Sequence, residues 1–100
     1  MEPGAGQKII MSGFKEIDES AMAILSKMIA THAKRIGHLA RNLDNIHITL
    51  KEVHQREKSE KYEVHAKVVD SGKVFVAEVT ERNLLAAVDN ALSKVSNEMD

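Results

Sequence analysis

The spacing of apolar residues changes from a helical period to a strand period near residue 45, and no other feature of the sequence constrains the fold as strongly. Between residues 22 and 43, apolar side chains recur at steps of three and four, which predicts a long amphipathic helix from about residue 19 to residue 42. At residues 46–51, apolar and polar side chains alternate, which predicts a half-buried strand. The chain therefore contains both helix and sheet, in separate segments.

The remaining segments carry similar signals. Asp18 or Ser20 is expected to cap the first helix, and Gly37 inside that helix permits a bend or a close packing contact. Residues 54–61 are all polar and are interpreted as a solvated hairpin loop. The other predicted elements are strands at residues 8–11, 62–68 and 74–79, a tight turn at residues 70–73, and a last helix that begins at Asn83 or Thr80.

The order of these elements is β-α-β-β-β-α, which predicts an α+β fold. A helix between the first two strands makes those strands parallel, while the later strands pair through hairpins. Both amphipathic helices must bury their apolar stripes, so we expect them on one face of a four-stranded mixed sheet, in a layout like that of double-stranded-RNA-binding domains. The expected boundaries are a flexible lead-in at residues 1–6, one domain at residues 7–97 and a tail at residues 98–100.

Length and composition exclude several classes of protein. A chain of 100 residues, 43% of them hydrophobic, forms a single globular domain rather than a disordered segment. No stretch approaches the roughly 18–20 apolar residues that a membrane span needs, and no signal peptide is visible. The sequence contains no cysteine, so disulfides and thiolate chemistry are excluded, which suits a cytoplasmic location.

Charge is distributed unevenly along the chain. The formal net charge of −1 excludes a polycation that holds nucleic acid by bulk attraction. However, residues 1–20 carry a net charge of −2 and residues 70–100 a net charge of −3, while residues 44–69 are balanced. Residues 21–43, which cover most of the predicted first helix, carry four basic residues and no acidic one.

These basic residues predict a cationic helix face. Lys27, Lys34 and Arg41 are spaced by seven and fall close to one line opposite the apolar stripe. Such a line matches the phosphates of a nucleic-acid backbone, whereas an ordinary solvated face, which is the alternative, usually mixes both signs of charge. With three aromatic residues the chain has too few for a base-stacking platform, so duplex or folded RNA is the better match. The residues that flank the line are Thr31, Arg35 and His38.

Several segments resemble the ribosome hibernation promoting factor family in its short form. The resemblance covers residues 7–97 and is strongest in the last thirty residues of the chain. The segments that carry it are residues 9–13 (IIMSG), 46–51 (IHITLK), 75–78 (FVAE), 83–89 (NLLAAVD) and 91–95 (ALSKV).

The resemblance implies a non-enzymatic, stress-associated factor. Proteins of this family bind the small ribosomal subunit between head and body, overlap the path of mRNA and tRNA, and so silence and protect idle ribosomes. Lys34, Arg35 and Arg41 match the basic part of the family's first helix, Lys94 matches a lysine of its last helix, and Lys15 lies where a base is common after the first strand. Together with the helix-face analysis, the expected RNA-binding residues are Lys15, Lys27, Lys34, Arg35, His38, Arg41 and Lys94.

Neither a metal site nor a catalytic site is expected. His32 and His38 lie six residues apart and so on different faces of the helix, while His47 and His65 are expected as outward-facing neighbours on adjacent strands. Without cysteine and without carboxylates that converge on a histidine, we predict no metal ion. The sequence has no glycine-rich phosphate loop and no nucleophile elbow, so we predict no catalytic residue, cofactor or small-molecule substrate.

Val74 and Val76 support an alternative function. If Phe75 and Ala77 face the helices, the two valines lie on the open face of the sheet. Valine is common in strands for its own sake, but an exposed pair also fits a homodimer or partner surface. The alternative is therefore a protein-interaction module that uses the open sheet face and does not bind RNA.

Overall fold

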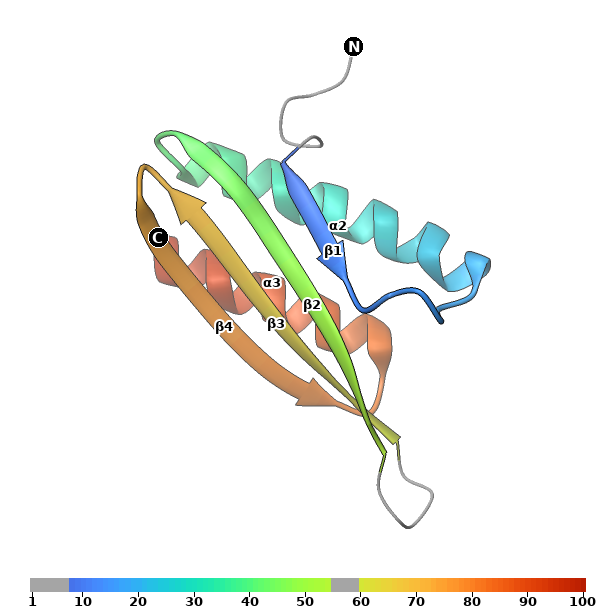
Figure 1. Cartoon of the computed structure of the whole chain (residues 1–100). Coiled ribbons are helices and arrows are strands. Elements are labelled where there is room, and N and C mark those ends of the chain that lie inside the picture. Colours follow the sequence, from blue (N-terminus) through green and yellow to red (C-terminus); the bar gives the residue numbers. More distant parts are fainter. Residues whose placement is uncertain (1–7, 55–59) are drawn as a thin grey trace.

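The computed structural model describes residues 8–54 and 60–100 and confirms the predicted α+β architecture. Its strands form one four-stranded sheet in the order β1-β2-β3-β4 (Figure 1). The elements in chain order are β1 (Ile9–Ser12), α2 (Glu19–Leu39), β2 (Leu43–His54), β3 (Glu60–Asp70), β4 (Lys73–Glu81) and α3 (Leu84–Met99).

The strand directions follow from the connections between strands. Strand β1 pairs parallel with β2, because α2 carries the chain back between them, and the other neighbours pair antiparallel. Ser71 and Gly72 in the β3–β4 turn both have positive φ angles, of 53° and 81°, which suits a two-residue hairpin turn. Both helices lie against the same face of the sheet, α2 behind β1 and β2, and α3 behind β3 and β4 (Figure 1).

Apolar side chains from both helices and from the covered sheet face form the core. On α2 the buried positions repeat at helical steps, and on β2 and β3 they repeat at every second residue. Burying one such side chain fully contributes about 1.5–3 kcal/mol, so this layer supplies most of the driving force for folding. The core includes Leu25, Ile29, Ala33 and Ile36 of α2, Ile46, Ile48, Leu50, Val64, Ala66 and Val68 of the sheet, and Ala87, Val88, Ala91, Leu92 and Val95 of α3.

Side-chain caps fix the start of each helix. The Asp18 carboxylate accepts a hydrogen bond from the backbone N–H of Ala21 at 2.8 Å, and Asn83 accepts one from Ala86 at 2.9 Å. Of the two candidates proposed for each helix, the structure therefore selects Asp18 and Asn83.

The ends of several elements differ from the prediction. Helix α2 ends at Leu39 rather than at residue 42, and α3 continues through Met99, which packs against the core, so residues 98 and 99 are not a tail. Strands β2 and β3 are longer than expected, and residues 54, 60 and 61 of the predicted hairpin loop belong to them. The rest of that loop, residues 55–59, and the predicted lead-in at residues 1–6 lie outside the described residues.

Asp70 explains why α2 stops early. Its carboxylate, on a side chain that is almost fully buried, accepts hydrogen bonds from the backbone N–H groups of Asn42 at 2.9 Å and Arg41 at 3.1 Å. The Ser71 hydroxyl donates to it as well, at 3.1 Å. Because these two N–H groups bond to Asp70, they do not continue the helical ladder, and the chain turns into β2. The contact joins the end of α2 to the β3–β4 turn.

Two glycines have opposite roles. Gly13 follows β1 with a φ of +86°, and a Cβ atom there would overlap the carbonyl oxygen of Leu50 on β2. Only glycine fits this approach of two backbones. Gly37 lies in α2, and a Cβ atom there would meet nothing within 4 Å, so the close packing contact suggested for it is wrong.

We predict opposite effects of alanine at these two glycines. Gly13→Ala should lower the free energy of unfolding by about 2–3 kcal/mol, because it adds backbone strain and an overlap with β2. Gly37→Ala should raise that free energy by roughly 1 kcal/mol, because alanine has the higher helix propensity. Urea denaturation of both variants checks this. Equal destabilisation by the two substitutions would contradict the backbone geometry described for them.

A second prediction concerns Asp70 and acid stability. The pKa of Asp70 lies below its usual value of 3.8, above all because the Asn42 N–H donates to its carboxylate. The Arg41 N–H, the Ser71 hydroxyl and the Arg41 charge lower this pKa further, while burial acts against them and raises it. The stabilisation is therefore fully present above pH 3.8 and is lost as the pH falls from there through the lowered pKa of the folded state.

Asp70→Asn should remove this part of the pH dependence and destabilise the protein at neutral pH. Asp44→Asn, at an exposed carboxylate of the same region, is the matched control and should leave the acid transition where it is. Urea denaturation between pH 2.5 and pH 7 measures both. An acid transition that is the same in Asp70→Asn as in the parent would contradict the assignment.

Candidate nucleic-acid interface

The exposed surface of α2 carries the basic residues that the sequence singles out. Because Leu25, Ile29 and Ile36 turn one stripe of the helix toward the sheet, the opposite side faces solvent. We give the name α2 cationic face to five exposed side chains on that side: Lys27, Thr31, Lys34, Arg35 and His38.

The α2 cationic face has no counter-charge of its own. None of the ion pairs within 4 Å between described residues involves Lys27, Lys34 or Arg35. Thr31 donates its hydroxyl proton to the Lys27 carbonyl at 3.1 Å, within the helix. The three cations are therefore available to an anionic partner.

Arg41 lies off the predicted line of the helix wheel, and this part of the prediction is wrong. Since α2 ends at Leu39, Arg41 lies in the connection to β2, with its backbone N–H bonded to Asp70 and its side chain exposed. Arg41 therefore adds an exposed cation beyond the end of the helix instead of extending the helical line.

Two further lysines lie at the end of the molecule where α2 leads into β2, near Arg41. The sequence did not predict either of them as an RNA-binding residue. The ammonium group of Lys8, just before β1, donates a hydrogen bond to the carbonyl oxygen of Leu43. Lys73 begins β4, directly after the turn that Asp70 joins to Arg41, and its Nζ lies 5.8 Å from the centre of the Phe75 ring. Only the tertiary contact between the two connections reveals this grouping, because Lys8, Arg41 and Lys73 are distant in sequence.

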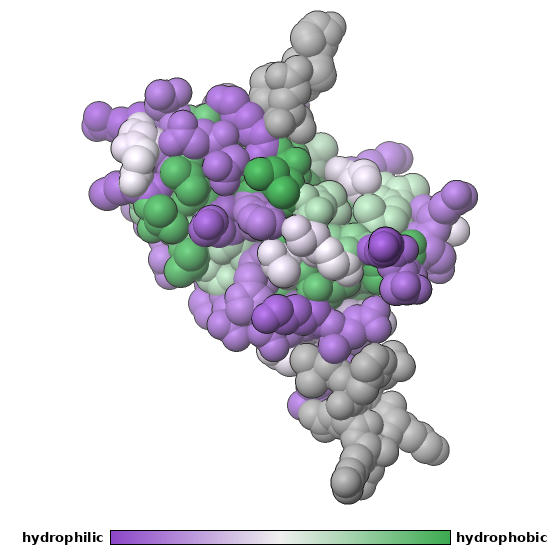
Figure 2. Space-filling model, viewed as in Figure 1, coloured by the Kyte–Doolittle hydropathy of each residue, from purple (hydrophilic) through white to green (hydrophobic). Residues whose placement is uncertain are grey.

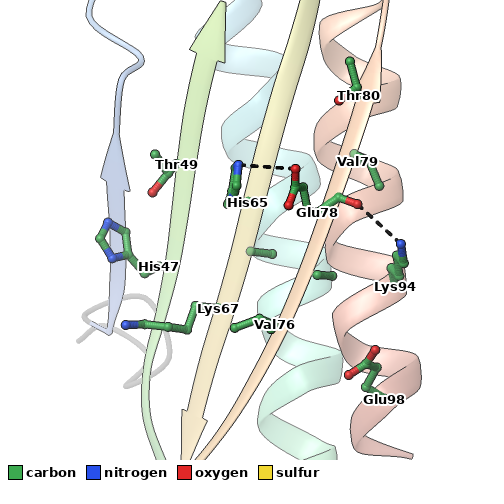
Figure 3. Close-up of a pocket in the computed structure, with 12 residues that line it drawn as sticks. His47, Thr49, His65, Lys67, Val76, Glu78, Val79, Thr80, Lys94 and Glu98 are labelled. Carbon is green, nitrogen blue, oxygen red and sulfur yellow. Dashed lines mark hydrogen bonds and ion pairs between the residues drawn. The ribbon is translucent and has the colours of Figure 1, made fainter.

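Lys15 and Lys94 do not join the α2 cationic face. Lys15 precedes the first turn of α2, and roughly 12 Å of helix, or two turns, separates that turn from Lys27, the first cation of the face. It also lies among acidic residues, Glu16, Asp18 and Glu19. Lys94 donates to the carbonyl oxygen of Glu78 at 3.4 Å on the edge strand β4 (Figure 3), where it protects an open strand edge.

The open face of the sheet has a different character. Val74 and Val76 are 59% and 57% exposed, while Phe75 and Ala77 face the helices, as expected. Figure 2 shows apolar areas on this face separated by hydrophilic side chains. Along the strands, Lys51, Lys61 and Lys67 are interspersed with two acidic residues, Glu63 and Glu78, so the described part of this face mixes both signs of charge.

The histidines are arranged differently from the prediction in two respects. His47 lies opposite Lys67, and His65 lies opposite Thr49, so the two histidines are diagonal and not direct neighbours. The expectation that no carboxylates converge on a histidine is wrong, because Glu63 and Glu78 both approach His65. The remaining contacts are between His47 and the Ser12 hydroxyl at 3.0 Å, and between His32 and Asp89 at 2.7 Å, which links the two helices.

Neither α2 nor α3 combines the length and the apolar content that crossing a bilayer requires, in the part of the chain that the structure describes.

No protein-family model and no curated protein matches the chain. Solved structures do share its fold. A ribosomal subunit interface protein from Coxiella burnetii is 21% identical and superposes with a TM-score of 0.59, over 91% of each chain. The Protein Y N-terminal domain from Thermus thermophilus is 15% identical with a TM-score of 0.59, again over 91% of each chain. The resemblance drawn from the sequence is thus confirmed at the level of the fold.

Proposed function

We propose that this protein is a cytoplasmic, non-enzymatic ribosome-associated factor that binds rRNA of the small ribosomal subunit through the α2 cationic face and silences and protects idle ribosomes. The observation that carries the proposal is the set of exposed, unpaired cations at Lys27, Lys34 and Arg35, together with Arg41. Cations without an internal partner neutralise phosphates at little cost in broken ion pairs, and each contact releases counterions.

The chemistry of the surface favours folded RNA over single strands. Of the three aromatic residues, Phe14 is buried, and Tyr62 and Phe75 are half-buried and packed against the core. None of them offers an exposed ring on which bases stack. Recognition by shape and phosphate contact, as in duplex RNA, fits a row of lysine and arginine side chains on a helix.

The similar structures support a ribosomal partner. One of the two similar structures reported above belongs to a protein named for the interface of ribosomal subunits. A domain that binds the small subunit through one helix face would exclude other ligands from the same place, and this exclusion is the proposed basis of silencing. It requires no catalytic group.

We predict that neutralising three cations abolishes most of the binding to small ribosomal subunits. The triple variant Lys34→Gln, Arg35→Gln and Arg41→Gln should reduce co-sedimentation steeply. The slope of log K against log salt should fall by about one unit per cation removed, about three in total. Sucrose-gradient sedimentation with purified subunits at several salt concentrations measures both quantities.

A matched triple variant controls for net charge. Lys51→Gln, Lys67→Gln and Lys94→Gln removes the same charge from the open sheet face and the β4 edge, and it should sediment with the subunits like the parent. If the two triple variants lose binding equally, or if the α2 variant loses none, the assignment of the interface to α2 is wrong.

A protein-interaction module remains the second candidate, favoured by the exposure of Val74 and Val76. It predicts that the chain self-associates through the open sheet face without binding ribosomes. Sedimentation equilibrium would then show concentration-dependent association that is lost in Val74→Lys plus Val76→Lys, because the substitutions place charges on an apolar contact. A parent chain that stays monomeric at high concentration, or a dimer that survives both substitutions, would exclude this candidate.

A further inference from the structure

A histidine and two glutamates converge on the open face of the sheet, away from the α2 cationic face. Glu63 and His65 are two residues apart on β3 and therefore point to the same side. Glu78 lies directly opposite His65 on β4. His65 Nε2 lies 2.5 Å from Glu63 Oε2 and 3.9 Å from Glu78 Oε2 (Figure 3 shows His65 and Glu78), and the three donor atoms lie within 4.8 Å of one another.

We propose that Glu63, His65 and Glu78 bind a divalent transition-metal ion of the zinc class, with water in the remaining position. One imidazole nitrogen and two carboxylates suit Zn²⁺, whereas Mg²⁺ and Ca²⁺ prefer oxygen ligands alone. Three protein ligands and one open position match the coordination of zinc sites that are accessible to solvent.

The distances suit such an ion after small side-chain rotations. Zinc bonds of about 2.0–2.1 Å in a tetrahedron separate neighbouring ligand atoms by about 3.3 Å. The separation of His65 from Glu63 is shorter than this value, and its separation from Glu78 is longer. Strand β3 pairs on both sides, with Thr49 and Glu78 opposite His65. The strand register therefore fixes the relative backbone positions of the three ligand residues.

The charges within the cluster also favour a cation. His65 forms a hydrogen bond with Glu63, while Glu78 lies beyond hydrogen-bond distance from it. The two carboxylates therefore have only one imidazole near them, and it forms a hydrogen bond with only one of them. A divalent ion would neutralise both carboxylates. Lys51 lies opposite Glu63, and Lys67 lines a shallow pocket together with His65 and Glu78, so their positive charges oppose the ion. We therefore expect affinity in the micromolar range and not the tight binding of a closed structural site.

Isothermal titration of the full chain with Zn²⁺ alone tests the proposal, with Mg²⁺ as the comparison ion and the visible spectrum of bound Co²⁺ as a second readout. The parent should bind one Zn²⁺ per chain and show no binding of Mg²⁺ at the same concentrations. His65→Gln and Glu78→Gln should each weaken Zn²⁺ binding at least tenfold. His47→Gln, at a histidine on the same face that contacts Ser12 instead, should change the affinity less than twofold.

Circular dichroism establishes that each variant is folded before the titration is interpreted. The proposal is wrong if the folded parent shows no saturable binding of Zn²⁺. It is also wrong if His65→Gln leaves the affinity unchanged, or if His47→Gln lowers it as much as His65→Gln does. None of these results depends on whether the protein binds ribosomes.

Discussion

Burial of both apolar helix stripes against one face of the sheet is the constraint on which the rest of the structure depends. Leu25 and Ile36 of α2 and Val88 and Leu92 of α3 are fully buried there. With both helices on that side, no described element covers the other face of the sheet, and the polar side of α2 must face solvent. The two surfaces that matter for function therefore result from one packing arrangement.

The α2 cationic face and the open face of the sheet differ in charge and therefore favour different ligands. The α2 cationic face presents lysine and arginine without internal partners, which is the requirement for binding phosphates. On the open face, lysines and glutamates are interspersed, and the glutamates gather around His65. The total charge of −1 hides both features, because acidic residues elsewhere in the chain offset the cations of α2.

Most of the fold follows from the sequence, because residue period, caps and turn residues are local signals. The periods of 3.6 and 2 place the core, and Asp18 and Asn83 mark the helix starts. The end of α2 was not predictable, since it depends on Asp70, which is 29 residues away from Arg41. The convergence of Glu63, His65 and Glu78 depends on the register between β3 and β4, and a period shows which face a residue occupies but not which residue lies opposite.

The reactivity of individual lysines tests most directly which surface meets the ribosome. Lys27, Lys34, Lys51 and Lys67 are all exposed in the free protein, so a lysine-acylating reagent should label all four. With small ribosomal subunits in excess, mass spectrometry should show that Lys27 and Lys34 become protected while Lys51 and Lys67 stay reactive. Protection of Lys51 and Lys67 with continued labelling of Lys27 and Lys34 would contradict the account.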